Sequence, residues 1–202
     1  MSALAAVIKA TMPRCPDPEG WAEAFASAFG ENPPGDLAMF FAQVGHESSD
    51  LTRLEEDLYY RSADRIKAIF PKSTRGLEGA ALQALARNPE RLANVVYAFK
   101  GGNGNSLSGD GWRFRGRGPF QITTRDNYVE LAKYIGIDVV KCPDLLCKDQ
   151  RVAAASAVWY WRAHVTDGAS IDRVTRQING VAMAGLADRR DRYLAGGGKV
   201  VA

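Results

Sequence analysis

The clearest pattern in this 202-residue chain lies in residues 36–48, which read DLAMFFAQVGHES. Asp36 is of a residue type that commonly caps the N-terminus of a helix. Apolar residues follow at the i, i+3, i+4 and i+7 positions of one helical face, namely Leu37, Phe40, Phe41 and Val44. The segment therefore predicts a helix from Asp36 to about Ser48 whose apolar stripe faces a protein core.

Similar patterns continue on both sides of this helix. We predict helices over residues 2–11, 21–29, 62–70, 88–97, 148–164, 170–178 and 186–194, with helical patterning also resuming near residue 126. Ser62 and the pair Asn88-Pro89 are favourable helix starts, and Pro71 is a favourable stop. The sequence therefore predicts a mainly α fold.

Residues 100–118 interrupt the helices, because glycine stands at positions 101, 102, 104, 109, 111, 116 and 118. We expect a long ordered loop or a small hairpin here. Alternating aromatic and arginine residues favour a short extended stretch over residues 112–121, which points Gln121 and Thr123 to the same side. No repeat or long linker divides the chain, so we expect a single domain over residues 1–202.

Composition and charge exclude several classes of protein. With 46% hydrophobic and 24% charged residues, the chain is typical of a globular protein and unlike a collagenous or disordered one. The 26 Lys and Arg residues exceed the 23 Asp and Glu residues by three, a bias that fits an anionic partner without requiring one. No stretch approaches the roughly 20 apolar residues of a membrane span, and no secretion signal is recognisable at the start, so we expect synthesis in the cytoplasm.

The cysteines and histidines offer little support for a covalent or metal cross-link. Three cysteines are an odd number, which disfavours a disulfide framework, although a bridge between Cys142 and Cys147 stays open. His46 and His164 are the two histidines and are far apart in sequence, so a zinc site has little support.

Glu47 is the most informative side chain. On a helix it lies almost directly over Phe40, seven positions earlier, so the apolar stripe runs into a carboxyl group. One interpretation is an ion pair or a hydrogen bond at the end of the helix. The other is a carboxyl group that lines an apolar cleft, where desolvation keeps a proton available for general-acid catalysis.

An acidic cluster follows at Asp50, Glu55, Glu56 and Asp57. These residues could form a solvated acidic turn. Glycoside hydrolysis, however, needs a second carboxylate besides the acid, which activates water or attacks the sugar. Glu55, Glu56 and Asp57 satisfy that chemical requirement equally.

A basic strip, residues 113–117, alternates Arg113, Arg115 and Arg117 with an aromatic residue and a glycine. Such a pattern could indicate a nucleic-acid surface or a phosphate-binding loop. Both fit poorly, because no Gly-Lys-Ser/Thr ending and no RNA- or DNA-binding signature accompanies it. We expect this strip to face the acidic segment of residues 47–57.

Ten motifs, in order along the chain, resemble family 19 glycoside hydrolases, and more narrowly the bacteriophage endolysin branch related to family 19 chitinases. They are HES at 46–48, LEEDLYY at 54–60, IFPK at 69–72, NVVY at 94–97, GDGWRFRGRG at 109–118, QIT at 121–123, DNY at 126–128, WYW at 159–161, ING at 178–180 and GLADR at 185–189. The resemblance spans about residues 36–194.

This resemblance implies an α-rich, lysozyme-like fold with a deep cleft and an inverting mechanism. It implies that Glu47 is the general acid, that Glu56, nine residues later, is the general base, and that Thr123 helps hold the attacking water. It implies that Arg189 organises the acidic pair. Further contacts with sugar are expected from Gln121, Asn127, Asn179, Trp112 and Tyr60. Asp126 departs from the tyrosine of plant members, and no cofactor or metal ion is implied.

We therefore expect an endolysin that hydrolyses the β-1,4 glycan strands of bacterial peptidoglycan. We expect residues 1–202 to form its single catalytic domain, without a separate cell-wall-binding domain. We expect it to act as a monomer, without nucleic acid or stable membrane insertion, and to reach the cell wall from the host cytoplasm by holin-type release. A chitinase acting on poly-N-acetylglucosamine is the nearest alternative, since both polymers share a β-1,4 amino-sugar backbone. A non-catalytic glycan-binding module and a nucleic-acid-binding protein are further alternatives, which binding without turnover and salt-dependent duplex binding would indicate.

Overall fold

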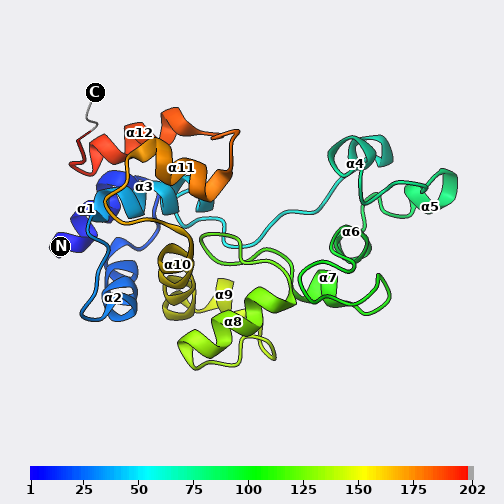
Figure 1. The fold of residues 1–202 in the computed structure, drawn as a ribbon, viewed down its shortest axis with the longest axis horizontal. Coiled ribbons are helices and arrows are strands. Elements are labelled where there is room, and N and C mark those ends of the chain that lie inside the picture. Colours follow the sequence, from blue (N-terminus) through cyan, green and yellow to red (C-terminus); the bar gives the residue numbers. More distant parts are fainter. Residues whose placement is uncertain (200–202) are drawn as a thin grey trace. The chain divides into compact units, whose positions relative to one another are not determined.

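The computed structural model describes residues 1–199, and its regular elements are helices (Figure 1). They are α1 (Ala3–Thr11), α2 (Pro18–Phe29), α3 (Leu37–Ser48), α4 (Ala63–Ile69), α5 (Gly79–Gln83), α6 (Pro89–Val96), α7 (Asp110–Arg113), α8 (Arg125–Ile135), α9 (Leu145–Lys148), α10 (Gln150–His164), α11 (Ile171–Asn179) and α12 (Leu186–Ala195). Within the described residues, pairing of the β type is limited to isolated bridges of Arg117 with Glu55 and Ile122. The prediction of a mainly α fold is confirmed.

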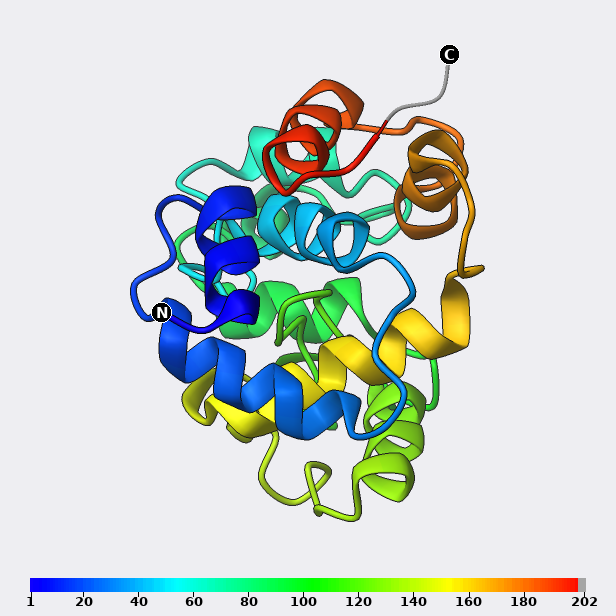
Figure 2. The ribbon, with the colours of Figure 1, turned by 90° about the vertical axis from the view of Figure 1, so that its left-hand side faces the viewer.

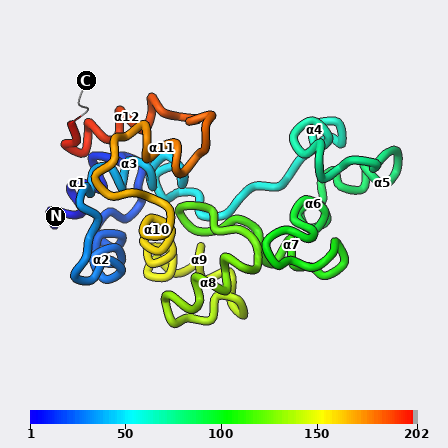
Figure 3. Tube along the Cα trace, in the orientation of Figure 1, coloured from blue at the N-terminus to red at the C-terminus, as the bar shows by residue number. Residues whose placement is uncertain are grey.

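The chain is divided between two compact units. Unit 1 comprises Met1–Leu54, Gly118–Gln121 and the chain from Asp144 onward, and unit 2 comprises Glu55–Arg117 and Ile122–Pro143. The chain passes from one unit to the other four times, so neither unit is a continuous piece of sequence (Figure 3). The prediction of a single catalytic domain without a separate cell-wall-binding domain stays a prediction.

The starts of the helices follow the capping signals of the sequence. The side chain of Asp36 accepts a hydrogen bond from the backbone N–H of Met39 at 2.9 Å and so caps α3. Ser62, Asn88 and Ser170 cap α4, α6 and α11 in the same way. Each cap satisfies a backbone N–H that the first turn of a helix leaves unpaired.

Unit 1 is built around buried aromatic rings. In this unit α2 lies along α10, and α3 packs against α1 and α12 (Figure 2). Phe40 on α3 is fully buried, and its ring centroid lies 5.2 Å from that of Trp161 and 5.5 Å from that of Phe25, both edge to face. Such pairs stabilise a core beyond the area that they bury. The predicted apolar stripe of α3 therefore faces the core.

Gly45 allows neighbouring elements to approach the second half of α3 closely. A Cβ atom at this position would lie 2.6 Å from Cγ of Met12 and 2.8 Å from Nη1 of Arg192. Real Cβ atoms essentially never come so close to another heavy atom. The missing side chain therefore lets α12 pack beside the turn of α3 that ends in Glu47.

Unit 2 has a smaller core of its own. The buried hydrophobic side chains between residues 58 and 96 form one cluster, made of Leu58, Ala63, Ile66, Leu82, Leu85, Leu92, Ala93 and Val96. In the other part of this unit, the ring of Phe114 lies 5.3 Å from that of Tyr128 on α8.

Some elements differ from the sequence prediction. Helices α5, α7 and α9 have five residues or fewer, too few to show a helical period in the sequence. The extended stretch predicted over residues 112–121 is wrong, because its first residues belong to α7 and residues 118–121 form a turn next to the bridge between Arg117 and Ile122. Gln121 in this turn has φ of 52°. Since alternation requires an extended backbone, the reason for placing Gln121 and Thr123 on the same side is removed.

Two further observations concern the membrane and the thiols. None of the helices in the described part of the chain is long and apolar enough to span a lipid bilayer. Cys15, Cys142 and Cys147 are free thiols, so the bridge left open between Cys142 and Cys147 is not formed in this structure. Burial raises the pKa of the Cys15 thiol.

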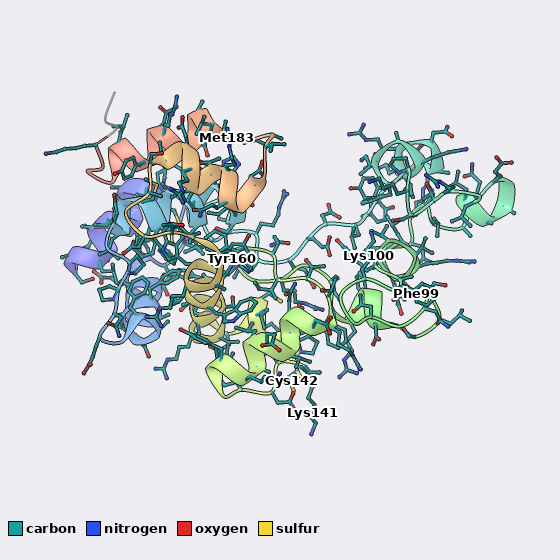
Figure 4. All side chains as sticks on the ribbon, in the orientation of Figure 1. Phe99, Lys100, Lys141, Cys142, Tyr160 and Met183 are labelled. Carbon is teal, nitrogen blue, oxygen red and sulfur yellow. The ribbon has the colours of Figure 1, made fainter. Side chains whose placement is uncertain are left out.

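The aromatic cluster predicts a large difference between two identical substitutions. Phe40→Ala removes a fully buried ring and should lower the free energy of unfolding by about 3–5 kcal/mol. Phe99→Ala is the control, since this side chain is 79% exposed (Figure 4) and should change the free energy by no more than about 0.5 kcal/mol. Urea unfolding of both variants measures the two values. Equal losses would contradict the role of Phe40 in the core.

Candidate active site

Glu47 lies in the last turn of α3 and pairs with Arg189 of α12. Nη2 of Arg189 donates a hydrogen bond to Oε1 of Glu47 at 2.5 Å. The Arg189 side chain is fully buried, whereas the Glu47 side chain keeps 21% of its surface exposed. The ion pair expected at the end of this helix is therefore present, and it leaves the carboxyl group within reach of solvent.

Arg189 makes two further contacts inside unit 1. Its Nη1 donates to Oε1 of Gln43 at 2.5 Å, and its Nε donates to the backbone oxygen of Ala184 at 3.3 Å. Nε2 of Gln43 in turn donates to Oγ1 of Thr175 at 3.3 Å. Sequence reasoning missed Gln43, although a polar residue four positions before Glu47 shares its helical face.

Charged side chains also tie the end of α3 to α12. Nδ1 of His46 lies 2.7 Å from Oδ2 of Asp188, and Arg192 donates to Asp188 at 2.7 Å and to Asp50 at 2.5 Å. Nε of Arg14 donates to Asp50 at 3.0 Å. Burial alone would raise the pKa of Asp50, but the hydrogen bonds from Arg14 and Arg192 outweigh it and hold this pKa below its ordinary value. The pKa of Asp188 is lowered in the same way, since hydrogen bonds from Arg192 and His46 outweigh burial.

Tyr160, labelled in Figure 4, belongs to α10, and its hydroxyl interacts electrostatically with Glu47. Burial raises the pKa of Tyr160, and the charge of Glu47 raises it further, against the opposing effect of Arg189. Its ring stacks on Phe120 at a centroid distance of 4.7 Å. The hydroxyl is therefore neutral near pH 7.

Glu56 lies in unit 2, where both of its carboxylate oxygens accept hydrogen bonds. The backbone N–H of Gly116 donates to Oε1 at 2.5 Å, and the hydroxyl of Tyr97 donates to Oε2 at 2.7 Å. Burial and the neighbouring charge of Glu56 raise the pKa of Tyr97 far above its ordinary value, so this hydroxyl remains a donor. The carboxylate is thus held in one orientation.

The two acidic neighbours of Glu56 have different surroundings. Glu55 forms ion pairs with Arg115 and with Arg117, whose side chain is 2% exposed. Asp57 is exposed, and its Oδ1 accepts a hydrogen bond from the backbone N–H of Tyr59 at 2.8 Å. Three carboxyl groups that sequence reasoning left equivalent therefore separate into an ion-paired group, a hydrogen-bonded group and a solvated turn residue.

Four of the other predicted site residues also lie in unit 2. The Asn127 side chain is exposed and donates to the backbone oxygen of Thr123 at 2.8 Å. Trp112 is half-buried beneath the guanidinium of Arg115, which lies 3.6 Å from its ring centroid. Tyr60 packs against the core cluster of this unit. The hydrogen bond between Asn127 and Thr123 joins residues that are four positions apart in sequence.

Gln121 and Asn179 belong to unit 1, and both support turns. Nε2 of Gln121 donates to the backbone oxygen of Gly118 at 3.1 Å. Oδ1 of Asn179, at the end of α11, accepts from the backbone N–H of Ala184 at 2.7 Å. Of the predicted site residues in unit 1, Arg189 is thus the one seen to bind Glu47 directly.

The described residues contain no group of three or more His, Cys, Asp or Glu side chains arranged to hold a metal ion. The chemistry available at Glu47 and Glu56 is that of carboxyl groups and hydrogen-bond donors.

Solved structures with the same fold define its class. Chitinase C from Streptomyces griseus superposes with a TM-score of 0.61 at 18% identity, covering 99% of this chain and 95% of that one. A bacterial family 19 chitinase gives a TM-score of 0.61 at 19% identity, covering 100% and 98%. The chain has the α-rich, lysozyme-like fold of these proteins, as predicted.

Sequence comparison gives the family. The family model described as class I chitinase of glycoside hydrolase family 19 matches residues 92–198, a range that does not include Glu47 or Glu56. A family 19 domain-containing protein of Haemophilus influenzae is 37% identical over 162 residues, or 78% of this chain and 76% of the relative. An endochitinase of Arabidopsis thaliana is 27% identical over 79% of this chain and 44% of its own length. The chain belongs to glycoside hydrolase family 19 and is a glycoside hydrolase.

The lowered pKa of Asp50 predicts a pH-dependent loss of stability. A carboxyl group whose pKa is lower in the folded chain stabilises it above the unfolded pKa, about 3.9, and loses this effect as the pH falls towards the folded value. Asp50→Asn should therefore destabilise the protein at pH 7, and its difference from the natural protein should shrink below about pH 4. Asp191→Asn, at an exposed position of α12, is the control. Urea unfolding across this pH range measures the effect, and a constant difference would contradict it.

Proposed function

We propose that this chain is an endolysin that hydrolyses the β-1,4 glycan strands of bacterial peptidoglycan. The observation that carries the proposal is the uneven distribution of charge along the chain, because an excess of surface cations favours binding of an anionic polymer over a neutral one. Chitin is an uncharged polymer, whereas peptidoglycan bears the carboxylates of its peptide groups.

Residues 58–100 of unit 2 hold eight basic residues and three acidic ones, whereas the rest of the chain holds eighteen basic and twenty acidic ones. The eight are Arg61, Arg65, Lys67, Lys72, Arg75, Arg87, Arg91 and Lys100, and all are exposed. None of them forms an ion pair with another described residue, in contrast to Arg115 and Arg117. Unpaired surface cations raise the local concentration of an anionic polymer.

In the proposed mechanism, Glu47 donates a proton to the departing glycosidic oxygen as the bond from the anomeric carbon breaks. Glu56 accepts a proton from the water whose oxygen bonds to that carbon from the opposite face, with inversion. Thr123 and Gln121 position this water. The contact of Arg189 with Oε1 of Glu47 and the contacts of Tyr97 and Gly116 with Glu56 support the proposal, since each carboxyl group is held in place by neighbours.

A chitinase is the second candidate. It is favoured by a relative in Arabidopsis thaliana that is named an endochitinase and by the structural likeness to bacterial chitinases. As an endolysin, the chain would act as a monomer, be made in the host cytoplasm and reach the cell wall after holin-type release, and we propose this as well.

Removing either proposed catalytic carboxyl group should abolish lysis. We expect Glu47→Gln and Glu56→Gln to lower the rate of turbidity loss of outer-membrane-permeabilised Gram-negative cells by at least about a hundredfold, since each removes a proton transfer. Glu78→Gln, an exposed residue of the same segment as the surface cations, is the matched control. Circular dichroism verifies that each variant is folded.

The same proteins should be compared on colloidal chitin. Faster sugar release from chitin than from cell walls would favour the second candidate. Wild-type activity in Glu47→Gln would overturn the assignment of the acid.

The inverting mechanism predicts the anomer of the product. Water attacks the face opposite the leaving group, so the newly formed reducing ends should appear first as the α-anomer. Proton NMR during the first minutes of digestion of soluble glycan strands measures this. An initial β-anomer would refute inversion.

A further inference from the structure

Gln43 lies one helical turn before Glu47, and its side chain is fully buried. A buried amide is stable only when its polar atoms have partners, and here Arg189 and Thr175 supply them. Arg189 and Thr175 are also fully buried. The three side chains and Glu47 form one chain of hydrogen bonds inside unit 1.

The guanidinium of Arg189 is held at two points along α3. Nη1 donates to Gln43 and Nη2 donates to Glu47, both at 2.5 Å. The donors of a guanidinium have a fixed planar arrangement, and positions i and i+4 share one helical face. Without Gln43, the guanidinium would keep Glu47 and the longer hydrogen bond from Nε to the backbone oxygen of Ala184 at 3.3 Å. The short contact with Gln43 gives the remaining nitrogen, Nη1, a partner and so fixes the position of Nη2 against Glu47.

Thr175 of α11 binds the NH₂ end of the Gln43 amide. Nε2 of Gln43 donates to the Thr175 hydroxyl, so Oε1 points to the guanidinium. A flipped amide would place its NH₂ group against the N–H groups of Arg189, so that two donors would face each other. Arg189 therefore determines the orientation of the amide, since the Thr175 hydroxyl could pair with either end.

We propose that Gln43 is a positioning residue for the reaction, acting through Arg189 on Glu47. The inference rests on the proposed function, since it takes Glu47 as the general acid. Oε1 of Glu47 is occupied by Arg189, and no described residue donates a hydrogen bond to Oε2. Gln43 thereby leaves Oε2 as the oxygen that holds the transferable proton.

The absence of charge on the Gln43 side chain matters for its role in positioning Arg189. Glu47 faces Arg189 from α12 and Tyr160 from α10, and it follows His46 on α3. An amide at position 43 orients the guanidinium without a second negative charge beside Glu47. A carboxylate there would orient the guanidinium but compete with Glu47 for its charge.

Two substitutions separate orientation from charge. Gln43→Met removes the acceptor for Nη1 of Arg189, and kcat on soluble glycan strands should fall by about ten- to a hundredfold with KM within about twofold. Gln43→Glu keeps an acceptor, so kcat at its own optimum pH should stay within about threefold of the natural value. Its added charge disfavours a second carboxylate nearby, so the alkaline limb of the pH–rate profile should move up by about one pH unit.

Gln83→Glu, on the exposed surface of α5, makes the same change in net charge and should leave the profile unchanged. Thr175→Val, which releases the amide, should lower kcat less than Gln43→Met. If Gln43→Met does not fold, Gln43→Glu and Thr175→Val decide alone. A merely structural role predicts lower unfolding midpoints with natural kcat and an unmoved alkaline limb, and that result would overturn the proposal.

The test is distinct from that of the proposed function. Activity that persists in Glu47→Gln removes the general acid and the inference together. An inactive Glu47→Gln beside Gln43 variants with natural kinetics overturns the positioning role alone.

Discussion

A fully buried guanidinium is the constraint on which unit 1 depends. Burying a charge is costly unless it is paired and hydrogen-bonded, and Arg189 meets this requirement through Glu47, Gln43 and the backbone of Ala184. Two of the three partners come from α3, so α12 can dock on α3 in one register. Glu47, the proposed general acid, is therefore also the counter-ion that allows Arg189 to be buried.

Unit 2 uses a buried arginine in a similar way. Arg117 is 1% exposed, pairs with Glu55, and donates to the hydroxyl of Tyr128 and the backbone oxygen of Arg113. Glu55 directly precedes Glu56, whose carboxylate accepts hydrogen bonds from Tyr97 and Gly116. In each unit, a buried arginine lies beside a proposed catalytic carboxyl group. The packing around that arginine helps to hold the carboxyl group in place.

The helices of this chain could be predicted because their signals are local. Asp36, Ser62 and Asn88 cap the helices that the sequence assigned to them, and the apolar stripe around Phe40 has a helical period. The short helices α5, α7 and α9 offer no such period, and the turn at residues 118–121 depends on a bridge to Arg117.

The site could be predicted less fully, because its contacts join distant parts of the sequence. The pair of Arg189 and Glu47 spans 142 positions, and no local pattern indicates it. Glu55, Glu56 and Asp57 are chemically alike in sequence, and they differ through Arg117, Tyr97 and solvent. Resemblance to a family singled out Glu56, whereas the physical reason for the difference lies in the partners of each group. Gln43 was missed because a glutamine on a helix is ordinary until its neighbours are known.

The four passages of the chain between the units have a consequence for synthesis on the ribosome. Unit 2 ends at Pro143, so all of its residues have been made before the last quarter or so of the chain emerges. The α2 and α3 helices can pack on each other early through Phe25 and Phe40, but their contacts with α10 and α12 form only when translation is nearly finished. Contacts of such long sequence separation form slowly and leave apolar surface open in the meantime. All of unit 2 is therefore available for folding before unit 1 is complete, and the surfaces of α2 and α3 that meet α10 and α12 stay exposed in the meantime.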